Sequence, residues 1–527
     1  MGRMRTSCRT TAVGGVLGLV IAIAVGGPIS AAPSPPPAPP PAPKARLTDA
    51  DVNRALDRLD AYVTAAMAKT GVPGVAVAVV HDDEVVRITG YGVRAAGRPE
   101  KVDADTVFRL ASLSKPLSST VVAGVLDKPE RWDEHVDLPG FGLKDPWVSE
   151  HVTTADLFSH RSGLPDHAGD LLEDIGYDQG QILDRLRHLP LAPFRASYAY
   201  TNFGLTAAAE AVAREHGASW EKLAADTLFT PAGMTHTTVT TPAFRAEADR
   251  ALPHVRGADG RWVPDDVRDP DAQAPAGGAN SNARDLARWM RLQLNGGTLD
   301  GRRIIPADTL ARTHLPEIVS RPPMTPDGGA GFYGLGWNVS YDDAGRLRLS
   351  HSGAFELGAN TTVTLLPLER LGIVVLTNSA PVGLADAIAL DFTDVAEHGR
   401  PTADWLAVAA YAYSQALDQG HSAIDWSRPP ADPAPARPDS AYLGTYTNPY
   451  YGTLTVTSAG PDGALTLTLG PAERPHRFAL THRDGDVFGM DTRGENAIGR
   501  AAVTFTDRGT VRVEWLDADH LGTFTRS

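Results

Sequence analysis

Apolar positions recur along this chain with two different spacings, and the change between them marks the expected elements. From Asp49 to Gly71 apolar side chains return every three or four residues, which predicts an amphipathic helix with Val52, Ala55, Leu56, Leu59 and Val63 on one face. Two apolar runs then flank the pair Asp82-Asp83 and predict two strands around an acidic turn. Further strand patterns occur at RLRLSHSG (346–353), NTTVTLLP (360–367) and LGIVVLTNS (371–379).

The order of these patterns indicates the fold class of residues 47–395. Strand patterns lie at both ends of this segment, and mostly helical patterns lie between them. Strands and helices mixed within one segment predict an α/β (α+β) fold for this part of the chain.

The last part of the chain is purely alternating and is expected to fold separately. A connector, residues 396–438, passes from a short helical pattern into PPADPAPARP. Beyond it GTLTVTS (452–458) and GALTLTLG (463–470) alternate strictly, and Asp507-Arg508-Gly509 predicts the turn of a hairpin. Residues 439–527 therefore predict a small antiparallel β-barrel or sandwich.

The N-terminus has the composition of an export signal. Arg3, Arg5 and Arg9 precede an apolar run, Ala12 to Val25, and small residues follow at Ser30-Ala31-Ala32. We expect a signal peptide over 1–32, a secreted or extracytoplasmic protein, and no stable membrane span once the signal is cleaved. An uncleaved anchor is the alternative. Residues 33–46 form a proline-rich linker of polyproline II type.

Charge and cysteine content exclude several functions. The formal net charge of −14 argues against nucleic-acid binding, which needs a basic face. The single cysteine, Cys8, precedes the apolar run, so a mature chain would have no thiol for a Cys nucleophile, a zinc site or a disulfide. The histidines show no metal-ligand spacing and no phosphate loop is present, so we expect no metal and no cofactor.

Ser112 and Lys115 are the first candidates for chemistry. They lie three residues apart at the start of an apolar helical pattern, so they share one face of its first turn. A serine hydroxyl needs a base within hydrogen-bond reach, and a lysine among apolar neighbours can have its pKa lowered far enough to act as one. The helix N-terminus adds positive potential where an oxyanion would form.

The same Ser-x-x-Lys spacing recurs at Ser219 and Lys222, so the spacing alone is not decisive. Ser219 lies where a helix N-cap is expected and has no apolar segment before it, and we interpret it as a structural cap.

Further motifs make the first pair specific. Tyr200-Thr201-Asn202 lies just before a helical pattern, and His351-Ser352-Gly353-Ala354 lies on a strand pattern. In this order the motifs resemble those of the serine β-lactamase and penicillin-binding-protein family, in its class C branch with D-aminopeptidases and esterases. The resemblance covers residues 47–395 and extends to GVPGVAVAVV, DTVFRLASLSKP, LFSHRSGLP, LFTPAGMTHT, PAGGANSNARDLARWM and YGLGW.

The resemblance implies the fold and the site. It implies an antiparallel sheet flanked by helices beside an all-helical lobe, with catalysis in the cleft between them. Ser112 would attack the substrate carbonyl, and Lys115 with Tyr200 would move the protons. Asn202 would orient the substrate amide and Lys115. The N–H groups of Ser112 and Ala354, beside Gly353, would form the oxyanion hole. His160 and Ser162 would be structural.

One departure from the family pattern bears on the substrate. Many members have lysine in the third motif, and here His351 stands in its place, mostly neutral at pH 7 but able to donate a hydrogen bond. The expected function is therefore an exported serine hydrolase acting on peptides, including those with D-residues, or on esters. The alternatives are a β-lactamase or D-alanyl-D-alanine carboxypeptidase acting on cell-wall-derived substrates, and a non-catalytic peptidoglycan-binding protein. A structural role for His351 also stays open.

The tail, YLGTYTNPYYGTLTVT, resembles the lipocalin-like module appended to some of these hydrolases. The resemblance implies that residues 439–527 cap the cleft or assemble a homo-oligomer, and a passive stabilising module is the alternative.

Overall fold

An eight-stranded antiparallel sheet organises the first part of the chain. The computed structural model describes residues 45–342, 345–417, 421–459 and 464–527, and the predicted signal peptide lies outside them. The strand order is β2-β1-β14-β13-β12-β11-β10-β9. Their bounds are β1 (Gly74–His81), β2 (Glu84–Gly92), β9 (Ile318–Arg321), β10 (Gly331–Tyr333), β11 (Asn338–Tyr341), β12 (Leu347–Phe355), β13 (Ala359–Leu366) and β14 (Leu371–Thr377).

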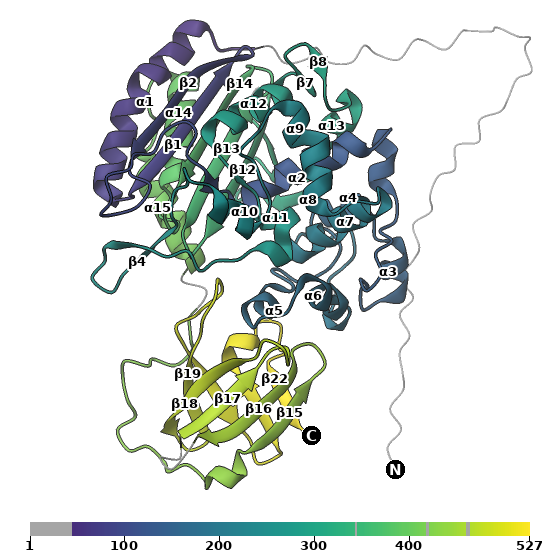
Figure 1. Ribbon diagram of the computed structural model, residues 1–527, viewed down its shortest axis with the longest axis vertical. Helices are drawn as coiled ribbons and strands as arrows, with labels where there is room; N and C mark the ends of the chain where they lie inside the picture. The colour runs from purple at the N-terminus through teal and green to yellow at the C-terminus, as the bar shows by residue number, and fades with distance from the viewer. Residues whose placement is uncertain (1–44, 343–344, 418–420, 460–463) are drawn as a thin grey trace, which may run out of the picture. The chain divides into compact units, whose positions relative to one another are not determined.

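The predicted hairpin at Asp82-Asp83 is confirmed as the β1–β2 connection. Both aspartates have positive φ, 47° and 69°, as a two-residue turn between twisted strands requires. Strand β1 also pairs with β14, so sequence segments about 300 residues apart lie side by side (Figure 1).

Helices cover both faces of this sheet, which explains why β1 is a continuous apolar run. Val75, Val77 and Val79 pack with α1 (Asp49–Thr70) and α14 (Leu384–His398) on one face. Ala76, Ala78 and Val80 face the other core, which includes α12 (Ala283–Leu294). Burying one valine side chain stabilises a fold by roughly 1.5–3 kcal/mol, so this register is strongly specified.

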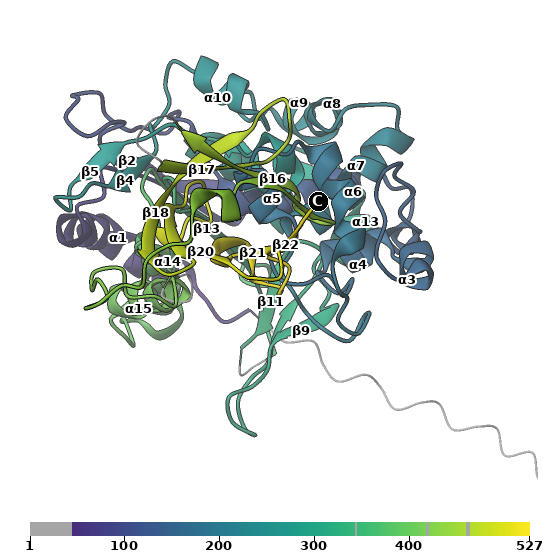
Figure 2. The ribbon, with the colours of Figure 1, turned by 90° about the horizontal axis from the view of Figure 1, so that it is seen from below.

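In sequence, a helical lobe lies between β2 and β9. Small and apolar residues predominate in its central helix, α7 (Asn202–Glu215), and most residues of this helix are buried. In Figure 2 several of its helices, α3, α4, α6 and α7, lie on one side of the view. The other helices of this part of the chain are α2 (Ser114–Val125), α3 (Pro146–His151), α4 (Thr154–Phe158), α5 (Asp170–Asp174), α6 (Gln179–Arg185), α7 (Asn202–Glu215), α8 (Trp220–Ala224), α9 (Thr230–Ala232), α10 (Thr241–Ala246), α11 (Ala274–Gly277), α13 (Ala307–Thr313) and α15 (Trp405–Leu417).

Three short two-stranded pairs complete this part. They are β3 (Phe108–Arg109) with β6 (Asn280–Ser281), β4 (His254–Arg256) with β5 (Trp262–Pro264), and β7 (Thr298–Leu299) with β8 (Arg302–Arg303). The β3–β6 pair directly precedes the turn that carries Ser112, and so anchors that turn to the body of the lobe.

The C-terminal strands close into an antiparallel barrel, which resolves the choice between barrel and sandwich. The alternation is confirmed, because Leu454, Val456, Leu465, Leu467 and Leu469 are all buried. The predicted hairpin at 507–509 joins two paired strands. The bounds are β15 (Gly444–Asn448), β16 (Gly452–Ala459), β17 (Ala464–Leu469), β18 (His476–Asp484), β19 (Val487–Asp491), β20 (Arg500–Phe505), β21 (Thr510–Val513) and β22 (Thr523–Arg526).

Loops of the barrel hydrogen-bond to the helical lobe. Gly169 N–H donates to the Tyr450 hydroxyl at 3.0 Å, beside the start of α5. The Asp174 carboxylate accepts the backbone N–H groups of Glu495 and Asn496 at 2.9 and 2.8 Å. These contacts fix the barrel loops to the helix that begins at Asp170.

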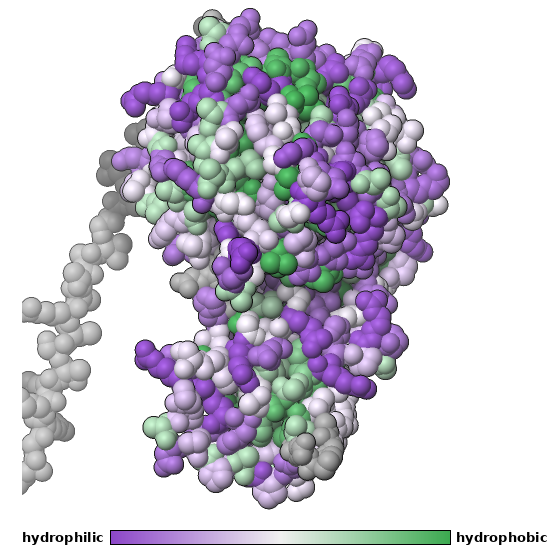
Figure 3. Space-filling view, turned by 60° about the vertical axis from the view of Figure 1, so that its left-hand side comes forward, coloured by the Kyte–Doolittle hydropathy of each residue, from purple (hydrophilic) through white to green (hydrophobic). Residues whose placement is uncertain are grey.

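The surface is largely polar where it is in view. Figure 3 shows one face on which hydrophilic side chains predominate and hydrophobic ones form small groups. Among the described residues, no helix combines the length and the apolar character needed to cross a membrane.

Candidate active site

Ser112 lies in a tight turn rather than on the following helix. It is the middle residue of a 3-10 helix, η1 (Ala111–Leu113), and α2 begins two residues later at Ser114. Ala111 has φ of 49°, a conformation that L-residues rarely adopt. This strained residue directly precedes Ser112, and strain of this kind is common at functional sites.

Strand β12 passes directly against this turn. A Cβ on Gly353 would lie 2.1 Å from the Leu110 carbonyl oxygen and 3.0 Å from the Leu113 nitrogen, so only glycine fits. Strand β12 pairs with β13 as far as Phe355, but with β11 only as far as Ser350. Since N–H groups alternate between the two sides of a strand, some of those in 351–355 face the unpaired side. Ala354, the predicted oxyanion donor, lies in this stretch.

Lys115 is fully buried and has three partners. Its Nζ lies 3.1 Å from Ser112 Oγ, 2.7 Å from Asn202 Oδ1 and 3.0 Å from the Ala276 carbonyl oxygen. The two carbonyl oxygens can only accept, whereas the serine hydroxyl can also donate. A neutral amine would therefore give its two N–H bonds to Asn202 and Ala276 and offer its lone pair to the Ser112 hydroxyl. Losing a proton leaves no group in this set unpaired.

Burial supplies the driving force for that deprotonation. It lowers the pKa of Lys115 from 10.5 to about 7, although the negative charge of Asp170 opposes the change. The lysine is thus poised between its two protonation states near neutral pH, as a general base requires.

Tyr200 supplies a phenol that keeps its proton. Its ring lies under the Lys115 ammonium, 4.4 Å from Nζ to the ring centroid. Burial raises the pKa of Tyr200 well above its ordinary value, while a hydrogen bond with Ser112 opposes this. Tyr200 is therefore a proton donor rather than a phenolate in the resting state.

Asn202 is the first residue of α7, and its amide orientation is fixed. Its Nδ2 donates to Asp170 Oδ2 at 2.8 Å, and a carboxylate can only accept when ionised. The amide oxygen must therefore face Lys115. The structure brings Ser112, Lys115, Tyr200 and Asn202 together, and β12 brings Gly353 beside them.

His351 is held inside the protein. Its Nδ1 donates to the Ser352 carbonyl oxygen at 2.8 Å, so its Nε2 accepts from the Tyr333 hydroxyl, also at 2.8 Å. Burial, with the nearby Lys115 charge, lowers the pKa of His351 to about 3. The ring is neutral and both nitrogens are used, so the N–H that would reach a substrate is already donated. Whether His351 binds substrate stays a prediction.

Tyr333 lies near the site and was not indicated by the motifs, whereas His160 was expected to have a structural role. His160 has φ of 59° and accepts twice around Tyr200, from Ala199 N–H at its carbonyl and from Thr201 N–H at Nδ1. It therefore fixes the backbone on both sides of Tyr200. His160 lies in the phrase SHRSGLP, on which the resemblance to the family partly rests. Its positive φ and its two hydrogen bonds around Tyr200 can be seen only in the structure.

The repeated motifs lie elsewhere. Ser219 caps α8, because its side chain accepts the Lys222 N–H, which confirms the structural interpretation. Tyr446-Thr447-Asn448 repeats the sequence of Tyr200-Thr201-Asn202 but lies in the barrel, where Asn448 accepts the N–H groups of Tyr450 and Tyr451 and so shapes the β15–β16 turn.

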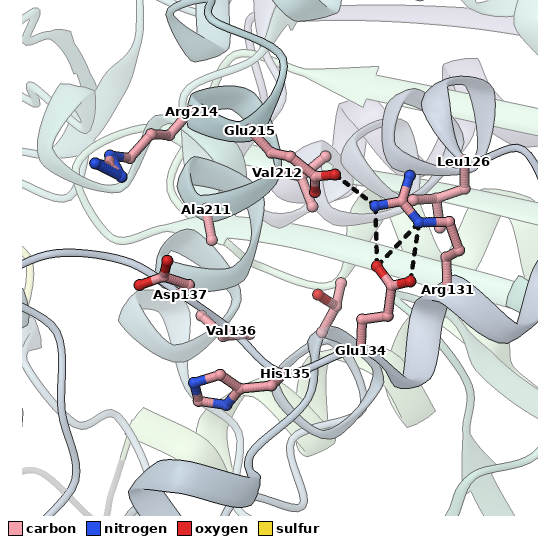
Figure 4. Close-up of a pocket in the computed structure, with 11 residues that line it drawn as sticks. Leu126, Arg131, Glu134, His135, Val136, Asp137, Ala211, Val212, Arg214 and Glu215 are labelled. Atoms are coloured by element: carbon pink, nitrogen blue, oxygen red, sulfur yellow. Dashed lines mark hydrogen bonds and ion pairs between the residues drawn. The ribbon is translucent and has the colours of Figure 1, made fainter.

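Pockets and ligand clusters elsewhere do not share these residues. A pocket of about 450 Å³ between η2 (Pro129–Asp133) and α7 is lined by both apolar and charged side chains, and Figure 4 shows Arg131 turned toward the carboxylates of Glu134 and Glu215. Among the described residues, one group has metal-ligand spacing, Asp49 with His81 and Asp82, and its aspartates are exposed. Neither feature contains a residue of the Ser112 cluster.

Comparisons with known proteins identify the family of this chain. The sequence model of the Beta-lactamase family matches residues 59–395, and that of a domain of unknown function, DUF3471, matches residues 428–519. The chain is 27% identical over 504 residues to the unguisins hydrolase ungD of Aspergillus violaceofuscus, covering 86% of this chain and 87% of that protein. It is 30% identical over 336 residues to penicillin-binding protein 4 of Amycolatopsis lactamdurans, covering 62% and 84%.

A solved structure has the same fold. The octameric penicillin-binding protein homologue from Pyrococcus abyssi superposes with a TM-score of 0.55 at 19% identity, covering 87% of this chain and 98% of that one.

Proposed function

Because this chain belongs to the Beta-lactamase family and is a β-lactamase-related serine hydrolase, we propose that it forms an acyl-enzyme on Ser112 and hydrolyses peptides or esters outside the cytoplasm. The observation that carries this proposal is the buried Lys115, whose Nζ lies 3.1 Å from Ser112 Oγ. Burial lowers the pKa of that lysine to about 7.

Acylation begins with neutral Lys115. Its lone pair accepts the Ser112 proton while Oγ bonds to the substrate carbonyl carbon, and the N–H groups of Ser112 and Ala354 stabilise the oxyanion. Tyr200 then gives its hydroxyl proton to the leaving nitrogen or oxygen as the bond breaks, and it recovers a proton from Lys115. Water takes the place of the leaving group in deacylation, by the same proton transfers in reverse.

The charge of the site favours substrates without an essential carboxylate at the third motif. His351 is neutral there, and its two nitrogens are bonded to Ser352 and Tyr333. A charged donor contributes about 1.5–3 kcal/mol to a hydrogen bond, against about 1 for a neutral one. Peptidase or esterase activity is therefore proposed ahead of β-lactamase or D-alanyl-D-alanine carboxypeptidase activity. A purely binding role would leave the Ser112–Lys115–Tyr200 set without a purpose.

Export and the role of the barrel are parts of the same proposal. The basic and apolar residues before Ala32 support secretion. The hydrogen bonds between the barrel and Gly169 and Asp174 support a capping role for residues 439–527, because these two residues lie at the two ends of α5, whose first residue, Asp170, binds Asn202. The octameric relative supports testing for a homo-oligomer.

The experiment compares the wild type with Ser112→Ala and Ser219→Ala on p-nitrophenyl esters, D- and L-aminoacyl p-nitroanilides and nitrocefin. Ser112→Ala should abolish every activity that the wild type shows. Ser219→Ala is the matched control, and it should retain activity while losing about 1 kcal/mol of stability with its cap. Activity that survives in Ser112→Ala would refute the proposal.

A further inference from the structure

A chain of four side chains links the buried lysine to the surface. Lys115 Nζ lies 2.7 Å from Asn202 Oδ1, Asn202 Nδ2 donates to Asp170 Oδ2 at 2.8 Å, and His167 Nδ1 lies 2.8 Å from the same oxygen. Lys115, Asn202 and Asp170 are buried, whereas 53% of the His167 side chain is exposed. This series of hydrogen bonds therefore connects the solvent-exposed His167 to Lys115, the proposed base.

Asp170 is an acceptor for both of its neighbours. Its Oδ2 is shared between the Asn202 amide and the His167 ring, and its Oδ1 is buried without a hydrogen-bond partner among the described residues. Asp170 Oδ2, which accepts the hydrogen bond from Asn202, is thus also the oxygen bonded to the exposed His167 ring. An ionised carboxylate here forces the Asn202 amide oxygen toward Lys115.

The charges along this chain alternate. Burial would lower the pKa of His167, but the hydrogen bond to Asp170 and the charges of Asp170 and Asp166 raise it to about 9. His167 is therefore a cation at neutral pH. Asp170 stabilises the protonated form of Lys115, while Lys115 and His167 repel each other. Since such coupling is reciprocal, a charge on His167 also destabilises protonated Lys115.

We propose that Asp170 and His167 are positioning residues of the hydrolase, which together set the orientation of Asn202 and the fraction of Lys115 that is neutral. This inference rests on the proposed function, because it assigns a role relative to Lys115 as the base. The negative charge of Asp170 favours the protonated form of Lys115, and the positive charge of His167 weakens this effect. The segment that carries both residues, at the start of α5, is hydrogen-bonded to the barrel through Gly169 and Tyr450.

Other ionisable groups surround the series of hydrogen bonds from Lys115 to His167. Those around Lys115 are neutral at working pH, since burial raises the pKa of Tyr200 and lowers those of His160 and His351. Glu173 lies near Asp170, and burial raises its pKa to about 7, so it titrates in the same range. It is unchanged in every variant below. The groups facing the chain are Tyr200, His160, His351, Asp166, Glu173 and Tyr450.

The two charges predict opposite effects. Removing the negative charge in Asp170→Asn takes away the group that favours protonated Lys115, so neutral lysine should persist to lower pH. Removing the positive charge in His167→Gln leaves Asp170 uncompensated, so neutral lysine should appear only at higher pH. A role confined to folding would lower the rate in both variants without moving the pH midpoint.

The experiment measures the second-order rate of labelling by a fluorophosphonate probe between pH 5 and 10. For the wild type the rate should rise through about pH 7. The midpoint should fall by about one unit in Asp170→Asn and rise by about half a unit in His167→Gln, within the usual range for a nearby charge. Asp170→Glu, which keeps the charge, should recover much of the wild-type midpoint. Asp178→Asn is the control, because Asp178 caps α6 through Gln181 and has a similar helix-terminal position.

Midpoints that stay fixed, or that move in the same direction in both variants, would overturn the inference. If Asp170→Asn does not fold, His167→Gln decides alone, because its ring is half-exposed and an unmoved midpoint contradicts the proposal. Ser112→Ala in the same assay separates the two levels. Labelling that persists in Ser112→Ala refutes the proposed function itself, whereas its loss together with unmoved midpoints refutes only the roles of Asp170 and His167.

Discussion

Replacing Lys115 with methionine should make the stability of the protein depend on pH in a different way. Lys115 has no exposed surface, and burial lowers its pKa from 10.5 to about 7. At 1.36 kcal/mol for each unit of pKa, the protonated form is disfavoured in the folded protein by about 5 kcal/mol. Methionine has nearly the same length and cannot be protonated, so the comparison isolates this term.

The sign follows from proton binding. Between about pH 7 and 10 the unfolded chain holds a proton on Lys115 that the folded protein lacks. The free energy of unfolding of the wild type therefore rises with pH in this range, by about 1.4 kcal/mol for each pH unit, relative to Lys115→Met. Over three units the difference between the two proteins should change by about 4 kcal/mol. The hydrogen bonds that methionine cannot make to Asn202 and Ala276 shift the whole difference but not its slope.

The assay is urea unfolding of both proteins at pH 6, 7, 8, 9 and 10, followed by tryptophan fluorescence. Lys222→Met is the matched control, because Lys222 is exposed and paired with Asp226 on a surface helix. Its difference from the wild type should be nearly flat across the same range. A flat difference for Lys115→Met would mean that Lys115 stays protonated in the folded protein, and the reasoning that makes it the base would be refuted.

Three further predictions follow from the site and the barrel. Tyr200→Phe should lower kcat by at least about two decades, because it removes a proton donor, and in combination with Lys115→Met the losses should be far from additive; full additivity would argue against a shared proton transfer. His351→Lys should raise the ratio of kcat/KM for carboxylated over methyl-ester substrates, and an unchanged ratio would show that position 351 does not face the substrate. Truncation after Pro435 should alter KM or widen the substrate range while residues 47–395 stay folded, and unchanged kinetics and an unchanged oligomer size would reduce the barrel to a passive module.

Local patterns were sufficient for the elements whose causes are local. The helix at 49–70, the turn at Asp82-Asp83 and the hairpin at 507–509 each follow from residues close together in sequence, and the structure confirms them. The α/β fold with its antiparallel sheet is also confirmed. The cap at Ser219 follows from its position alone.

The partners of the site residues could not be predicted in this way. Tyr333 reaches His351 only because β10 and β12 lie in the same sheet on either side of β11. Asp170 reaches Asn202, 32 positions further along the chain, because the start of α5 lies beside the start of α7, and nothing in the sequence between them indicates this. A neutral, internally bonded His351 is a consequence of tertiary burial, which a sequence pattern does not contain. The charge on His167 depends on the hydrogen bond that its ring makes to Asp170, which the sequence analysis did not identify.

The central claim is that Ser112 is activated by Lys115, and peptide mapping of the labelled protein tests it most directly. The protein is treated with a fluorophosphonate at pH 6 and at pH 8, digested, and analysed by mass spectrometry for the modified residue and the extent of modification. The account predicts one adduct, on Ser112, formed severalfold faster at pH 8 than at pH 6 and lost in Lys115→Met. An adduct on Ser219, or an adduct on Ser112 that forms equally fast without Lys115, would contradict it.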